Sequence, residues 1–92
     1  MTLDDIPAAV AAHYGLTQAD LLKQSRFRFY VRPRQVAMYL AREQGRWSLP
    51  EIARCFNRHH TTILHGIRQI EGMAHRPEIK SAIAGAKRRL AA

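Results

Sequence analysis

The sequence predicts an all-α fold, a compact helical bundle, and three observations support this prediction. The chain has 92 residues, which is enough for one hydrophobic core and too few for a second. Hydrophobic residues make up 47% of the chain and charged residues 24%, as is typical of a folded globular domain. The apolar residues recur every three or four positions, and no stretch alternates as a strand does. We therefore expect a single domain over residues 1–92.

The first part of the chain carries signals for two helices. Asp4 or Asp5 can cap a first helix that ends at Tyr14, because Gly15 readily adopts the left-handed conformation that stops a helix. Thr17 is a suitable N-cap for a second, short helix.

A longer helix is expected from Arg32, after an exposed basic connector at residues 23–28. Proline is tolerated in a first turn, so Pro33 is compatible with a helix that starts there. Gly45 is expected to end it. Its apolar residues recur along one side: Val36, Ala37, Leu40 and Ala41.

Three more helices are expected, and the first two are separated by a very short break. The run Ser48-Leu-Pro-Glu51 combines a capping serine, a first-turn proline and a glutamate that can bond back to the cap, and the helix it opens reaches Phe56. Asn57-Arg58 forms the break before a helix from about His59 to Ala74. This pair has the dimensions of a helix-turn-helix motif. A last helix is expected over residues 77–90.

The helix from His59 has an apolar face and a polar face. The apolar face carries Ile63, Leu64, Ile67 and Ile70, and the opposite face carries Thr61, His65 and Arg68. The N-terminal end of such a helix is where base edges are contacted. His59 or His60 can donate to a base, and Thr61 and Thr62 can contact a thymine methyl group or a phosphate. An ordinary helical hairpin with a polar surface is the alternative, and for His60 the alternative is packing or capping, since helical projection turns it toward the apolar side.

The net charge of +8, with a sequence pI near 10.8, indicates an anionic partner. Twelve of the fifteen basic residues are arginine, which suits phosphate and guanine. Residues 1–25 carry a net charge of −2, residues 26–58 carry +6 and residues 59–92 carry +4. Five arginines precede the helix pair: Arg26, Arg28, Arg32, Arg34 and Arg42. Arg26 and Arg28 lie in the connector and can enter a minor groove, although a solvated charge run is the alternative.

Several other classes of function find no support in the sequence. No apolar run approaches the roughly 18 residues of a membrane span, and a single cysteine, Cys55, cannot form an internal disulfide, so a cytoplasmic protein is expected. The spacing of His59, His60 and His65 does not match a helical metal site. No phosphate-binding glycine loop and no nucleophile with a base occur, so we expect neither an enzyme nor a nucleotide, metal or other cofactor. The few aromatic residues make an RNA-binding platform a minor alternative.

Five stretches of the sequence occur in an order that is typical of one family. They are Val10-Ala-Ala-His-Tyr14-Gly-Leu, Ala19-Asp-Leu-Leu22, Arg32-Pro-Arg-Gln35-Val-Ala-Met-Tyr39-Leu-Ala-Arg42-Glu, Ser48-Leu-Pro-Glu-Ile52 and His60-Thr-Thr-Ile-Leu-His65. Over about residues 8–74 the chain resembles the C-terminal DNA-binding domain of the bacterial replication initiator DnaA. The resemblance implies binding to a short, asymmetric double-stranded site of the DnaA-box type, with the second helix of the motif in the major groove and a basic loop in the minor groove.

The resemblance also implies roles for individual residues. Arg26 resembles the minor-groove arginine. Backbone contacts are implied for Arg34, Gln35, Arg42, Leu49 and Pro50, and His65 is expected to join them. The recognition set comprises Arg58, His60, Thr61 and Thr62, and His59 stands beside it.

The chain departs from the family at the turn of the motif and in its extent. The family turn reads FGGRDHTT, whereas residues 56–62 are one residue shorter and have His59 in place of the aspartate. An aspartate accepts from a cytosine amine while a neutral histidine can donate, so the base preference is expected to change. The initiator's nucleotide-binding and N-terminal modules have no counterpart here.

We therefore expect a stand-alone regulator in the nucleoid, acting at promoters or as a competitor at initiator boxes. The alternative is an interaction module whose extra C-terminal helix docks on a protein partner or a second copy, with DNA affinity secondary.

Overall fold

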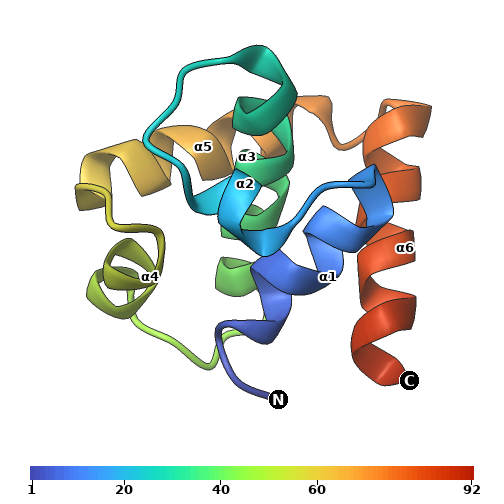
Figure 1. Cartoon of the computed structure of the whole chain (residues 1–92), viewed down its shortest axis with the longest axis horizontal. Coiled ribbons are helices and arrows are strands. Elements are labelled where there is room, and N and C mark those ends of the chain that lie inside the picture. The colour runs from blue at the N-terminus through green and yellow to red at the C-terminus, as the bar shows by residue number, and fades with distance from the viewer.

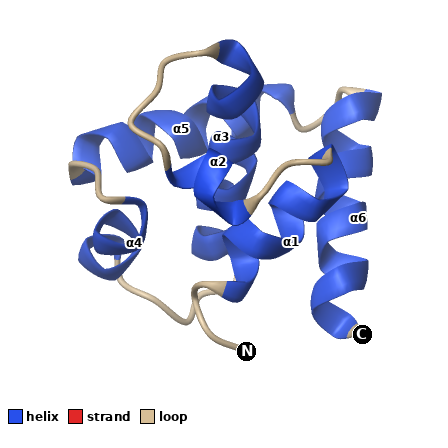
Figure 2. Ribbon diagram, in the orientation of Figure 1, coloured by secondary structure: helices blue, strands red, loops and turns tan.

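The structure, a computed structural model, describes all 92 residues and confirms the all-α prediction. Figure 1 shows its six helices, and Figure 2 shows that only loops connect them. The helices are α1 (Asp5–Tyr14), α2 (Gln18–Leu22), α3 (Arg28–Glu43), α4 (Leu49–Phe56), α5 (His60–Met73) and α6 (Pro77–Ala91). The bundle measures 28 × 27 × 24 Å. No helix is long and apolar enough to cross a membrane.

Helix α3 is the centre of the bundle and contacts all five other helices. Its buried apolar side chains follow the predicted stripe: Val36, Ala37, Met38, Leu40 and Ala41. Helix α5 packs along α3 with Ile63, Ile67 and Ile70 buried. Since burial of each such side chain stabilises the fold by roughly 1.5 to 3 kcal/mol, this contact fixes α5 on the bundle.

Helix α6 packs beside α1, as Figure 1 shows on the right of the molecule. Ile79, Ala82, Gly85 and Ala86 are its buried residues. The approach is close, because a Cβ atom added at Gly85 would lie 2.5 Å from Nδ1 of His13. The apolar face of α6 is therefore used within the fold.

The predicted helix signals operate as expected at three helix ends. Gly15 has φ 71° and stops α1, and Thr17 forms a reciprocal capping box with Asp20. Ser48 accepts from the backbone N–H of Glu51, whose carboxylate accepts from the backbone N–H of Ser48. These side chains satisfy N–H groups that have no partner within the helix.

The start of α3 differs from the prediction. The helix begins at Arg28 instead of Arg32, so Pro33 lies inside it, and the connector shortens to residues 23–27. A proline within a helix has no N–H for the carbonyl four residues earlier, here that of Phe29.

Candidate nucleic-acid interface

Helices α4 and α5 form a helix-turn-helix whose turn is built around Asn57. Asn57 has φ 51° and ψ 50°, a left-handed conformation that asparagine tolerates better than most residues. The backbone N–H groups of Asn57 and Arg58 donate to the carbonyls of Arg54 and Ala53, which closes the end of α4. His59 then caps α5, so three residues separate the two helices. This tight turn fixes the direction in which α5 leaves the core.

The N-terminal end of α5 presents four exposed residues in sequence: His59, His60, Thr61 and Thr62. The Nδ1 atom of His59 accepts from the backbone N–H of Thr61 and lies 2.8 Å from the Thr61 hydroxyl oxygen. In the neutral ring the proton is therefore on Nε2, which leaves Nε2 as a donor. In that tautomer the hydroxyl of Thr61 donates to Nδ1, and its oxygen keeps the capacity to accept from a base.

His60 is exposed, whereas helical projection turned it toward the apolar side. Its ring packs against the ring of His59, with centroids 4.2 Å apart and planes inclined by 31°. It sits in the first turn, before the apolar stripe begins at Ile63. His60 therefore packs on its neighbour in the first turn and stays outside the core.

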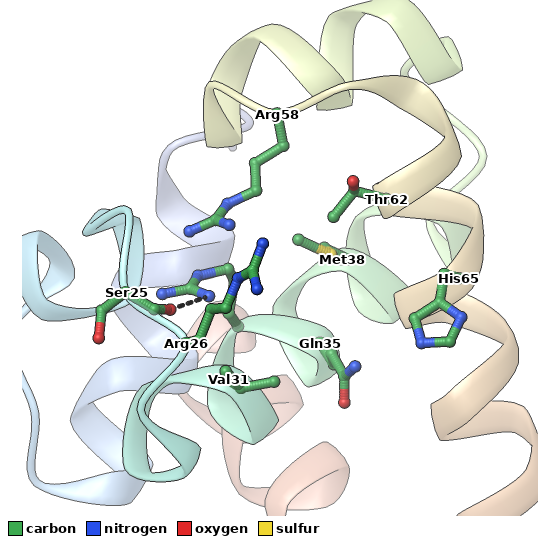
Figure 3. A pocket seen from close by; sticks show the side chains of 9 residues that line it. Ser25, Arg26, Val31, Gln35, Met38, Arg58, Thr62 and His65 are labelled. Atoms are coloured by element: carbon green, nitrogen blue, oxygen red, sulfur yellow. Dashed lines mark hydrogen bonds between the residues drawn. The ribbon is translucent and has the colours of Figure 1, made fainter.

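A groove of about 560 Å³ lies between the connector, α3 and the start of α5. Figure 3 shows Arg58 entering it from the turn, Thr62 and His65 from α5, and Val31, Gln35 and Met38 from α3. Ser25, Arg26 and Arg34 complete its lining. No carboxylate lines the groove, so its positive charge is uncompensated and suits a phosphate backbone.

Arg34 is the one buried charged residue in the molecule and holds the connector in place. It is 4% exposed. Its guanidinium donates to the carbonyl of Leu21 at 2.6 Å, that of Ser25 at 3.0 Å and that of Lys23 at 2.7 Å. Burial, and then the charge of Arg58, lower the pKa of Arg34 to about 10, so it stays protonated at neutral pH.

Arg58 joins the same connector to the turn of the motif. Its Nη2 donates to the carbonyl of Lys23 at 2.6 Å, and the side-chain amide of Gln24 donates to the carbonyl of Asn57 at 3.1 Å. The Nε of Arg58 is buried without a partner, and burial lowers the pKa of the guanidinium. The arginine therefore lies across the gap between the two proposed DNA-contacting segments.

The structure brings some of the predicted site residues together and leaves others apart. The residues around the groove are Arg26, Arg34, Gln35, Arg58, Thr62 and His65. Arg28 is exposed in the first turn of α3, and Arg42 is exposed in its last turn. Leu49 and Pro50 begin α4, half-buried and exposed respectively. No pattern in the sequence indicates the anchoring role of Gln24 or the carbonyls that accept from Arg34 and Arg58.

Comparison with known proteins identifies the family. A family model described as the bacterial dnaA protein helix-turn-helix matches residues 3–70. The chromosomal replication initiator protein DnaA of Caulobacter vibrioides is 53% identical over 74 residues, which cover 79% of this chain and 15% of that protein. The protein of the same name from Sphingopyxis alaskensis is 44% identical over 92 residues, which cover 98% of this chain and 20% of that protein.

A solved crystal structure of a DNA replication initiation factor has the same fold. It matches with a TM-score of 0.80 and 35% identity, over 95% of this chain and 27% of that one. The matches to this structure and to the Sphingopyxis relative both extend into the residues of α6. This helix is therefore part of the shared fold and not an addition to it. The chain spans about a fifth or less of these curated relatives. The chain belongs to the family of the bacterial DnaA helix-turn-helix domain, a non-catalytic DNA-binding domain.

Proposed function

We propose that this domain recognises a short, asymmetric duplex site of the DnaA-box type. The N-terminal end of α5 enters the major groove, and the connector carrying Arg26 enters the adjacent minor groove. The observation that supports this most strongly is the set of hydrogen bonds between the connector and the turn, Gln24 to Asn57 and Arg58 to Lys23. These bonds hold two basic segments on one face, as simultaneous contact with both grooves requires.

The proposed contacts divide by chemistry. Bases are contacted by His59, His60, Thr61 and Thr62, the minor groove by Arg26 and Arg28, and the DNA backbone by Gln35, Arg42, Leu49, Pro50 and His65. For Arg34 and Arg58 we propose that the main role is to position the connector. Their uncompensated charges also attract the phosphates, so the roles expected for them as DNA contacts are retained as secondary ones.

We propose further that the domain regulates by occupancy, at promoters or as a competitor at initiator boxes in the cytoplasmic nucleoid. Support comes from the match of this chain to the DnaA helix-turn-helix family, because domains of one family are expected to bind similar boxes. Titration of this protein into a complex of a full-length DnaA with box DNA tests the competitor role. Displacement supports it, and simultaneous binding without displacement contradicts it.

Selection of duplexes from a randomised pool at about 150 mM salt tests the site itself. We expect a box-like sequence that is altered at the base pair facing His59, because the histidine presents a donor where the family has an acceptor. Enrichment of no sequence would contradict specific recognition. If about six phosphates are neutralised, a plot of the logarithm of the binding constant against the logarithm of the salt concentration should have a slope near −5.

Thr61→Ala tests the recognition role of α5. We expect a loss of about 1 to 3 kcal/mol in binding and a relaxed preference at one base pair, with an unchanged salt slope, because no charge is removed. Gln69→Ala is the matched control, since it also removes no charge and Gln69 is exposed on α5 two turns beyond Thr61. A Thr61→Ala variant that keeps full specificity in fluorescence anisotropy would contradict the assignment.

A further inference from the structure

Two phenylalanines are exposed at the end of the connector. Phe27 is 55% exposed and Phe29 is 67% exposed, and apart from Met1 these are the exposed large hydrophobic residues of the molecule. Their rings stack on each other with centroids 5.2 Å apart and planes inclined by 28°. The proposed function described above assigns nothing to this pair.

The pair is held at the start of α3 by local hydrogen bonds. Phe27 is the N-cap residue, and its carbonyl accepts from the backbone N–H groups of Tyr30 and Val31 at 2.9 and 3.0 Å. The backbone N–H of Phe27 donates to the hydroxyl of Ser25 at 3.1 Å. The backbone of the pair is therefore ordered before any partner arrives, which lowers the entropic cost of inserting the rings.

The positive charge around the two phenylalanines favours an anionic partner. The sequence alternates basic and aromatic residues from Arg26 to Phe29, and no acidic residue occurs between Leu21 and Arg42. Arg28, Phe29, Val31 and Arg32 line a common surface depression. A second copy of this chain would bring the same positive charge to the contact, whereas DNA offers phosphates around an apolar stack of bases.

We propose that Phe27 and Phe29 form a wedge that inserts at a base step in the minor groove, next to the place where Arg26 enters. This inference rests on the proposed function, because it needs the connector in the minor groove. Apolar side chains inserted in this way partially unstack the step and kink the duplex by about 20 to 90° toward the major groove. Phe27 directly follows Arg26, which lines the groove beside α5, so the wedge continues the same interface.

The test uses the duplex selected from the randomised pool, with 2-aminopurine replacing one adenine at a time. We expect the fluorescence of 2-aminopurine to rise at one base step, at the end of the site where the connector lies in the minor groove. In a second measurement, energy transfer between dyes on the two duplex ends should report a bend. In Phe27→Ala/Phe29→Ala both signals should be lost and affinity should fall about tenfold or more, as for other lost base–aromatic contacts. Its salt slope should equal that of the wild type, because no charge is removed.

Arg28→Ala is the matched control on the same segment. It should reduce the salt slope by about 1 while the 2-aminopurine signal is retained. Both phenylalanines are exposed, so the double variant is expected to fold, and circular dichroism checks this. Absence of any fluorescence change or bend with saturating wild-type protein would overturn the wedge while leaving the proposed function intact, since binding of the selected duplex is measured separately. DNA-free self-association that is lost in the double variant would also overturn it in favour of a dimer contact.

Discussion

The backbone carbonyl of Lys23 accepts hydrogen bonds from two arginines, Arg34 and Arg58. Two guanidinium groups near one carbonyl, with no carboxylate beside them, repel each other. The arrangement is stable because the carbonyls of the connector act as their acceptors, and hydrogen bonds from charged donors are the stronger kind. These two side chains therefore hold the connector in its folded position and also supply positive charge to the groove.

Arg34→Ala separates positioning from a direct phosphate contact. We expect the variant to lose at least about 2 kcal/mol of unfolding free energy, because the carbonyls of Leu21, Lys23 and Ser25 lose their shared donor. Arg34→Lys, which keeps the charge but lacks the planar donor fork, should be destabilised as well. Urea denaturation measures both variants. Unchanged stability combined with weaker DNA binding would instead support a phosphate contact alone.

At the scale of elements, the turn between α4 and α5 sets the orientation of α5, the proposed recognition helix. Asn57 takes the left-handed conformation at a turn that is one residue shorter than the family pattern. The shorter turn still closes α4 through two backbone hydrogen bonds. The left-handed conformation of a single residue, Asn57, thus makes this turn.

Substitution of Asn57 tests this explanation. Asn57→Gly should keep the stability within a few tenths of a kcal/mol, because glycine adopts the left-handed region freely. Asn57→Val should cost at least about 1 to 2 kcal/mol, since a β-branched side chain is strained there. Thermal unfolding followed by circular dichroism compares them. Equal stability of the two variants would mean that the turn can adopt another conformation.

Local signals explain which elements could be predicted from the sequence. The caps at Thr17 and Ser48 and the stop at Gly15 act within a few residues, so they could be read directly. The start of α3 could not, because a proline shows where a helix is allowed to begin and does not prevent an earlier start. The roles of Arg34 and Arg58 depend on carbonyls of a distant segment, which leave no pattern in the sequence.

At the scale of the whole molecule, the closeness of α3 and α5 sets the width of the basic groove. Gly66 of α5 is buried against α3, and a Cβ atom there would lie 2.8 Å from Sδ of Met38 and 3.3 Å from Cγ of Gln35. Met38 and Gln35 both line the groove. A small residue at this one position thus links core packing to the shape of the basic groove.

Gly66→Ala is expected to displace the buried side chain of Met38, at a cost of about 1 to 3 kcal/mol that exceeds the gain in helix propensity. Gly72→Ala on the same helix is the matched control, because nothing lies within 4 Å of its added Cβ atom. That variant should be stabilised by up to about 1 kcal/mol. Denaturation midpoints of the two variants measure the difference, and stabilisation of both would show that Met38 moves aside without cost.

The hydrogen bonds between the connector and the turn also set the separation between the two proposed contact regions along a DNA site. In the proposed complex these bonds would fix the distance between the bases that the connector and the start of α5 contact. One inserted base pair would displace one contact region by about 3.4 Å and rotate it by roughly a tenth of a turn. A substituted base pair costs about 1 to 3 kcal/mol, whereas this insertion would remove one whole group of contacts. Natural sites of this domain should therefore vary in sequence more than in length.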